Sequence, residues 1–256
     1  MAMLTIRQVR VLGDNYAYLL HEPQTGATAA IDPGEADPLL AEAQAQGWEI
    51  GTVLITHHHA DHIGGVAAIK AATGCRVVAP AADLHRIPGV DLAVGDDDTV
   101  PLGETHAMVF EVPGHTSGHI AYWFMGEDAL FPGDTLFALG CGRLFEGSAE
   151  EMWQSLCRLR ALPDETQVFC GHEYTLGNAA FALSVDPDNA ALAARAAEVE
   201  ALTRKRRPTV PSLLGLEKET NPFLRADDPA LAAALGMAGA PPVAVFAEIR
   251  RRKDVF

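Results

Sequence analysis

Residues 56–65 read Thr-His-His-His-Ala-Asp-His-Ile-Gly-Gly, and this segment constrains the chain more than any other. It follows the apolar run 53–55 and precedes a helical pattern, so it is predicted to be the turn between a strand and a helix. Histidine is the commonest metal ligand in proteins and a carboxylate adds an oxygen donor, so these crowded side chains predict a site for zinc, iron or manganese. A histidine cluster exposed on a loop is the alternative, which the flanking strand and glycines disfavour.

Three later apolar runs end in one shared pattern, a glycine followed at once by a histidine or an aspartate. The glycine lets the backbone turn and approach a neighbour closely, so the next side chain can point into a site at the edge of a sheet. The residues placed in this way are His115, Asp134 and His172. One such match would be weak evidence, but its recurrence favours a shared metal site.

The first two thirds of the chain alternate short β-type runs with helical segments. The apolar, β-branched or aromatic runs cover residues 9–12, 16–20, 27–31, 53–56, 77–79, 107–112, 120–124 and 168–170. Hairpins come before and after the helical crossovers. This order predicts mixed sheets with helices outside them, and not a doubly wound parallel sheet.

Several helices have readable ends. Asp37 is predicted to cap a helix that stops at Gly47, and a second helix is predicted over residues 63–73. Ser148 and Glu151 have the spacing of a capping box at the start of a third helix.

The character of the chain changes after residue 172. Residues 189–207 are rich in alanine, glutamate and arginine and predict a helix, and further helices are predicted after Pro229 and after Pro242. The β-type runs all but vanish. The sequence therefore predicts two domains, a mixed α/β domain over residues 1–172 and a smaller helical one over residues 173–256.

Charge and composition exclude several classes of protein. No run approaches the roughly 18 uninterrupted apolar residues of a membrane span. The net charge is −15, and residues 1–172 hold 8 Lys and Arg against 23 Asp and Glu, so neither a membrane nor nucleic acid is expected as a partner. The N-terminus shows no secretory signal and the 4 cysteines form no Cys-x-x-Cys pair, so a cytoplasmic protein with reduced thiols is expected.

The motifs, in their order along the chain, resemble those of the metallo-β-lactamase superfamily. They begin with Asp32 in Ile-Asp-Pro-Gly, continue through residues 56–65, and end with the three glycine-preceded residues described above. Within the superfamily the chain is similar to the glyoxalase II family, the hydroxyacylglutathione hydrolases. The resemblance implies an α+β fold, a four-layer αββα sandwich followed by a smaller C-terminal helical domain.

The resemblance also implies a binuclear site for two divalent ions, with zinc as the expected metal and iron or manganese as substitutes. Carried over by position, the ligands are His57, His59 and His115 for one ion, Asp61, His62 and His172 for the other, and Asp134 as the bridge. Asp32 would orient a ligating imidazole. His57, Asp61 and Asp134 are then the catalytic residues, acting through a metal-bound hydroxide.

Residues 141–147, Cys-Gly-Arg-Leu-Phe-Glu-Gly, resemble the substrate loop of the family, in which lysine and tyrosine commonly stand at the positions of Arg143 and Phe145. Arginine keeps the cation, whereas phenylalanine lacks the hydroxyl. The segments 172–175, 221–225 and 250–254 also follow the family pattern. The implied substrate contacts are Arg143, Phe145, Tyr174, Arg250 and Lys253. On composition alone, a terminal helix with solvated charges is the alternative for the last two.

The implied reaction is hydrolysis of S-(2-hydroxyacyl)glutathione, chiefly S-D-lactoylglutathione, to glutathione and D-lactate, the second step of methylglyoxal detoxification. Attack by a metal-bridging hydroxide fits a sequence without a Gly-x-Ser-x-Gly elbow. One alternative is a persulfide dioxygenase with a single iron on the same fold. The second alternative is another hydrolase of the superfamily, such as a nuclease, and the acidic net charge disfavours a nuclease. A monomer is expected.

Overall fold

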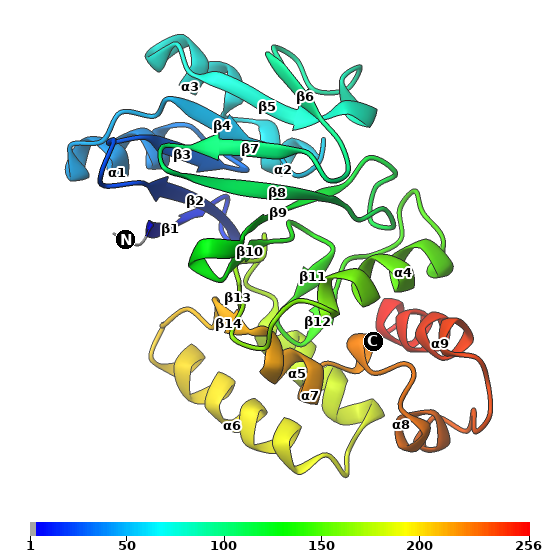
Figure 1. The fold of residues 1–256 in the computed structure, drawn as a ribbon. Coiled ribbons are helices and arrows are strands. Elements are labelled where there is room, and N and C mark those ends of the chain that lie inside the picture. Colours follow the sequence, from blue (N-terminus) through cyan, green and yellow to red (C-terminus); the bar gives the residue numbers. More distant parts are fainter. Residues whose placement is uncertain (1–3) are drawn as a thin grey trace. The chain divides into compact units, whose positions relative to one another are not determined.

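The computed structural model describes residues 4–256, which divide into two compact units (Figure 1). Of the described residues, the first unit comprises 4–111 and 118–133, and the second comprises 112–117 and 134–256. In the described part of the chain, no helix has both the length and the apolar character that crossing a membrane requires.

The first unit is built on a mixed six-stranded sheet. Its strands, in spatial order, are β1 (Thr5–Val11), β2 (Asn15–His21), β3 (Thr28–Ile31), β4 (Thr52–Leu54), β5 (Arg76–Pro80) and β6 (Leu92–Val94). The pairs β1–β2 and β2–β3 are antiparallel, and the pairs from β3 to β6 are parallel. Because the parallel strands point the same way, the segments that follow β3 and β4 leave the sheet at one edge.

Helices cover one face of this sheet. They are α1 (Asp37–Gln46) and α3 (Val66–Thr73), and the short α2 (Ala60–Ile63) precedes α3. Leu39 of α1 and Ile69 of α3 pack in one core cluster with Leu19 of β2 and Val53 of β4. The predicted Asp37 cap is wrong by one residue, because Ala36 occupies the cap position and Asp37 already lies in the first turn.

A second sheet in the first unit is antiparallel throughout. Its strands are β7 (Thr99–Leu102), β8 (Thr105–Glu111), β9 (Ile120–Phe124) and β10 (Ala129–Phe131). The 3-10 turn η2 (Met125–Glu127) lies between β9 and β10, whereas η1 (Ala81–Asp83) follows β5 of the first sheet. The rings of Tyr18 and Phe131 meet edge to face at 5.3 Å. The Tyr122 hydroxyl donates to the carbonyl of Ile55 at 3.0 Å. The two sheets therefore pack face to face, and the prediction of mixed sheets with helices outside is confirmed.

The second unit is mainly helical. It contains β11 (Leu136–Phe137), β12 (Gly140–Cys141), α4 (Ala149–Arg160), β13 (Gln167–Val168), α5 (Thr175–Val185), α6 (Ala190–Arg204), β14 (Ser212–Leu213), α7 (Leu214–Thr220), η3 (Pro222–Leu224), α8 (Pro229–Ala234) and α9 (Pro242–Asp254). The strands pair antiparallel as β11 with β12 and β13 with β14.

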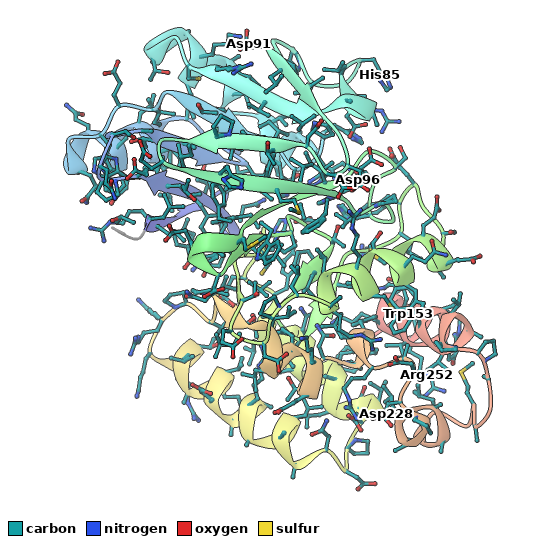
Figure 2. All side chains as sticks on the ribbon, viewed as in Figure 1. His85, Asp91, Asp96, Trp153, Asp228 and Arg252 are labelled. Carbon is teal, nitrogen blue, oxygen red and sulfur yellow. The ribbon has the colours of Figure 1, made fainter. Side chains whose placement is uncertain are left out.

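Local sequence sets the starts of these helices. The predicted capping box of Ser148 and Glu151 is present at α4, and Asn189 and Asp228 cap α6 and α8 through their side chains. On α9, Arg252, labelled in Figure 2, donates to the carbonyl of Leu235 at 3.0 Å, which ties α9 to the end of α8.

Candidate functional site

Asp32 fixes the start of the histidine motif in the first unit. It follows β3, and the Thr56 amide and hydroxyl donate to its two carboxylate oxygens at 2.7 and 2.6 Å. The Nδ1 of His62 lies 3.1 Å from the same carboxylate. Asp32 is buried, and the two hydrogen bonds from Thr56 hold its carboxylate in place. With its Nδ1 against Asp32, the ring of His62 turns its opposite nitrogen away from this carboxylate.

Two imidazoles of the motif meet through their nitrogens. His57 is fully buried, and its Nε2 lies 3.1 Å from Nδ1 of His59. Nitrogens at about 2.0–2.1 Å from one tetrahedral zinc ion are roughly 3.3 Å apart, so this pair fits a shared cation. The ring of His62 lies 4.2 Å from that of His57, and Asp32, His57 and His62 also form a cluster of suitable donors for a metal.

Asp61 is positioned by a residue that was not predicted. Asn15 of β2 is buried, and its amide donates to Oδ2 of Asp61 at 2.9 Å. The same oxygen lies 3.6 Å from Nε2 of His62. Asp61 and His62 are therefore brought together as the predicted pair of donors, with Asn15 as a support.

His58 belongs to the same motif but contacts a different carboxylate. Its Nδ1 is 3.0 Å from Oδ2 of Asp83, a buried carboxylate in η1. Its Nδ1 therefore faces a carboxylate that is not among the predicted ligands.

In the second unit, two imidazoles converge on Asp134. The Nε2 atoms of His115 and His172 lie 3.5 and 3.2 Å from the same oxygen, Oδ2 of Asp134. The Nδ1–H of His115 donates to the carbonyl of Arg143 at 2.9 Å. In the neutral ring this leaves Nε2 as an acceptor that faces a carboxylate oxygen, an arrangement that a shared cation stabilises.

The glycine before Asp134 is required by space. Gly133 has a φ of 49°, and a Cβ at this position would lie against the Thr56 hydroxyl and 2.7 Å from Cε1 of His119. A side chain would displace both groups. The Gly-Asp pattern in the sequence therefore marks a close approach of the backbone to the histidine motif.

Two predicted substrate contacts lie against ligand-type histidines of the second unit. The ring of Phe145 is 5.2 Å from that of His115, and the ring of Tyr174 stacks on His172 at 4.6 Å. Phe145 is 62% exposed and Tyr174 is 41% exposed. Large exposed aromatic side chains beside such histidines are available to contact a ligand.

The two predicted cationic contacts on α9 differ in their surroundings. Arg250 is buried and donates to the carbonyl of Cys141 at 3.0 Å, and its guanidinium lies 5.1 Å from the centre of the Phe223 ring. Lys253 is half-buried, and its Nζ donates to the carbonyl of Gly177 at 3.2 Å. Burial, with the cations of Arg250 and Arg143, lowers the pKa of Lys253. Arg143, Arg250 and Lys253 therefore form a cluster of positive charge.

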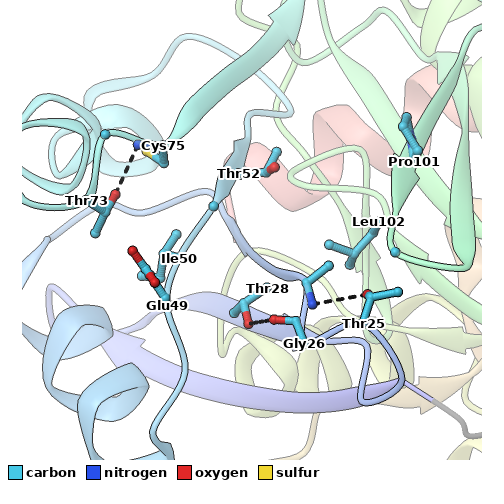
Figure 3. Close-up of a pocket in the computed structure, with 14 residues that line it drawn as sticks. Thr25, Gly26, Thr28, Glu49, Ile50, Thr52, Thr73, Cys75, Pro101 and Leu102 are labelled. Carbon is cyan, nitrogen blue, oxygen red and sulfur yellow. Dashed lines mark hydrogen bonds between the residues drawn. The ribbon is translucent and has the colours of Figure 1, made fainter.

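A separate pocket of about 500 Å³ opens elsewhere in the first unit (Figure 3). Its lining includes Thr28, Thr52 and Cys75, which stand at or beside the starts of β3, β4 and β5. Asp32 and the histidine motif, by contrast, follow the ends of β3 and β4. This pocket is therefore at the opposite edge of the sheet and does not belong to the candidate site.

Family models match the chain along almost its whole length. Residues 10–172 match that of the metallo-beta-lactamase superfamily, and residues 173–256 match that of the hydroxyacylglutathione hydrolase C-terminus. The chain is 62% identical over 254 residues to the hydroxyacylglutathione hydrolase of Methylococcus capsulatus, covering 99% of each chain. It is 58% identical over 256 residues to that of Rhodospirillum rubrum, covering 100% of each.

Solved structures show the same fold. ETHE1 from Myxococcus xanthus is similar with a TM-score of 0.70 and 26% identity, over 96% of this chain and 90% of that one. TTHA1623 in a di-iron-bound form is similar with a TM-score of 0.62 and 27% identity, over 86% of this chain and 100% of that one.

Proposed function

Because the chain belongs to the hydroxyacylglutathione hydrolases of the metallo-beta-lactamase superfamily, we propose that it hydrolyses S-(2-hydroxyacyl)glutathiones, chiefly S-D-lactoylglutathione, to glutathione and D-lactate. The observation that carries the proposal is the shared contact of His115 and His172 with one oxygen of Asp134, since a bridging carboxylate must serve two metal ions at once. Family membership confirms the resemblance that the sequence motifs predict.

The donor set fits two divalent ions, which we propose are zinc, with iron or manganese as substitutes. By the order of the motifs, the proposed ligands are His57, His59 and His115 for one ion, Asp61, His62 and His172 for the other, and Asp134 as the bridge. When bound, two such ions lower the pKa of a water molecule toward roughly 7 and polarise a carbonyl oxygen. His57, Asp61 and Asp134 are the residues that we assign to catalysis.

Neighbouring residues hold these donors in place. Asp32 accepts from Thr56 and lies against Nδ1 of His62, the Arg143 carbonyl accepts from His115, and Asn15 donates to Asp61. Each of these hydrogen bonds fixes a ring or carboxylate before substrate arrives, so little reorganisation is needed during the reaction. The departing glutathione thiol has an ordinary pKa of about 8.5, so the reaction needs no strong general acid.

Glutathione carries two carboxylates and one ammonium, so a thioester of it is anionic. We assign Arg143 and Lys253 to its carboxylates, Phe145 and Tyr174 to its apolar and backbone parts, and Arg250 to the same group of contacts. The cluster of three cations supports this assignment, because it offers positive charge in a chain whose net charge is −15.

We further propose that residues 1–172 form the catalytic domain and residues 173–256 the substrate-binding domain. The protein would act as a monomer in the cytoplasm, without nucleic acid or membrane as a partner. The free state of its cysteines, residues 75, 141, 157 and 170, supports a reducing compartment.

Release of free thiol from S-D-lactoylglutathione by the zinc-loaded protein tests the proposed function. Saturable release that stops on chelation and returns with zinc is the expected result. His57→Gln should abolish it, whereas His106→Gln, an exposed histidine of β8, should leave it unchanged. No thiol release by the loaded protein, or oxygen uptake with a persulfide and one iron per chain, would refute the proposal.

A further inference from the structure

The tip of the β11–β12 hairpin adopts a conformation that its sequence disfavours. Leu139 has a φ of 58°, in the left-handed region that favours glycine. Its side chain is fully buried in a cluster with Ala182 of α5 and Val199 of α6. A leucine persists in this conformation only where its surroundings over-determine it.

Buried side chains bind the backbone polar groups of this turn. The Leu139 amide donates to Oε2 of Glu217 at 2.9 Å. Asn178 donates to one turn carbonyl at 3.1 Å, and Asn221 donates to two others at 3.2 and 3.0 Å. The turn is therefore held by three polar side chains of the helical segments α5, α7 and the start of η3, and by a leucine inserted between α5 and α6.

The acceptor at the centre of this arrangement is part of a buried ion pair. Glu217 is 0% exposed and Arg195 is 5% exposed. Arg195 pairs with Oε1 of Glu217 and donates to the Thr220 hydroxyl at 2.6 Å. The other carboxylate oxygen, Oε2, accepts from the Leu139 backbone amide and, at 3.1 Å, from the Asn221 side-chain amide. A buried ion pair is a weak source of stability, because desolvation offsets its attraction. The structural consequence of this ion pair is that the Glu217 carboxylate is held at one position, where it accepts from the Leu139 amide.

The open end of the same hairpin carries the candidate site. Asp134 lies two residues before β11, and Gly142 follows β12 directly. A Cβ on Gly142 would lie against the carbonyl of Asp134 and 2.9 Å from Nδ1 of His115. The next carbonyl, that of Arg143, is the acceptor for this Nδ1. A shift of the hairpin would therefore move a carboxylate, a ring orientation and the substrate loop together.

We propose that the buried cluster of Arg195, Glu217 and Asn221 positions the hairpin, and through it Asp134 and the substrate loop 141–147. The three are positioning residues, and they act on zinc affinity and turnover by holding one backbone conformation. The proposal rests on the proposed function, because it takes Asp134 as a metal ligand.

Two double variants separate the hydrogen-bond acceptor from the charge. Arg195→Met with Glu217→Gln removes both charges and keeps a side-chain oxygen for the Leu139 amide. Arg195→Met with Glu217→Leu removes both charges and the acceptor. The control, Arg225→Met with Asp186→Asn, removes another ion pair of the same unit. In that pair Arg225 also binds Asp228, and neither partner binds the hairpin turn.

The measurements are amide hydrogen exchange at Leu139, zinc affinity by competition with a chelator, and kcat/KM for S-D-lactoylglutathione. A buried donor without its acceptor raises the opening equilibrium roughly 5- to 150-fold. We expect exchange at Leu139 to be faster by about that factor in the Glu217→Leu double variant than in the Glu217→Gln one. The acceleration should be confined to residues 137–143, and zinc affinity and kcat/KM should fall with it.

Other results would overturn the positioning role. Equal Leu139 exchange and equal zinc affinity in the two double variants would overturn it. Faster exchange at all protected amides, or equally fast exchange in the control with Arg225→Met and Asp186→Asn, would also overturn it, because a merely structural role predicts that pattern. Absence of thiol release by the unmodified protein would instead refute the proposed function. In that case, Leu139 exchange and zinc affinity would still decide the positioning role.

Discussion

Replacing Arg250 by methionine is expected to destabilise the second unit in addition to weakening substrate binding, whereas replacing Lys253 is expected to weaken substrate binding alone. The buried Arg250 makes a charge-assisted hydrogen bond to the Cys141 carbonyl, a cation–π contact with Phe223 and an ion pair with Asp254, which is 44% exposed. These contribute about 1.5–3, about 0.5–2 and about 0–1 kcal/mol respectively. Methionine keeps the packing of the stem, so only these polar contacts are lost, and the net loss is about 2–6 kcal/mol.

Thermal unfolding and steady-state kinetics together test this difference. A loss of about 2–6 kcal/mol corresponds to a fall in Tm of roughly 4–24 °C for a chain of this size. Lys253→Met should change Tm by less than about 4 °C. It should raise KM for S-D-lactoylglutathione and lower kcat/KM roughly 10- to 150-fold with little change in kcat, because a contact made equally in ground and transition states affects binding alone.

A small thioester without the glutathione carboxylates is the matched substrate control. Lys253→Met should leave its hydrolysis unchanged, whereas Arg250→Met should slow hydrolysis of both substrates, because the Cys141 carbonyl that Arg250 binds belongs to the substrate loop. An Arg250→Met variant with unchanged Tm and a defect confined to the glutathione substrate would refute the structural role given to this arginine.

Three further results are expected. Asp134→Ala should lose more activity and more bound zinc than Asp61→Ala, because two imidazoles share Oδ2 of Asp134, and equal zinc contents by elemental analysis would contradict this. Hydrogen bonds, first that of the Thr25 hydroxyl, lower the pKa of Glu22 from 4.5 to about 2, so its stabilisation is complete above pH 4.5 and fades as the pH falls toward 2. Between about pH 7 and about pH 3 the Tm should therefore fall less for Glu22→Gln than for the unmodified protein, and parallel falls would argue against it. Burial raises the pKa of the Cys141 thiol to about 11, so iodoacetamide should label it far more slowly than an exposed thiol, and rapid labelling seen by mass spectrometry would contradict its burial.

The sequence predicts those elements whose ends and periods are encoded locally. The capping box at Ser148 is an example, because Ser148 and Glu151 lie only three residues apart and bind each other's backbone amides. The strand β7 escaped prediction because Pro101 interrupts its short apolar pattern. The helix α5 escaped it because apolar residues surround it on several sides, so it lacks an amphipathic pattern.

The candidate site shows the same division. The proposed metal ligands stand in compact motifs at the ends of apolar runs, so spacing and resemblance point to them. Asn15 and Glu217 give no such signal, because their partners Asp61 and Leu139 lie 46 and 78 residues away in the chain. Supports of this kind become visible only when the fold brings distant segments together.

Titration of the metal-free protein with zinc, with bound metal and thiol release followed in the same samples, tests the two-ion account most directly. Seven proposed ligands that include a bridging carboxylate predict that activity rises to its maximum at about two ions per chain. Full activity reached at one ion per chain, with no further gain on adding zinc, would contradict it.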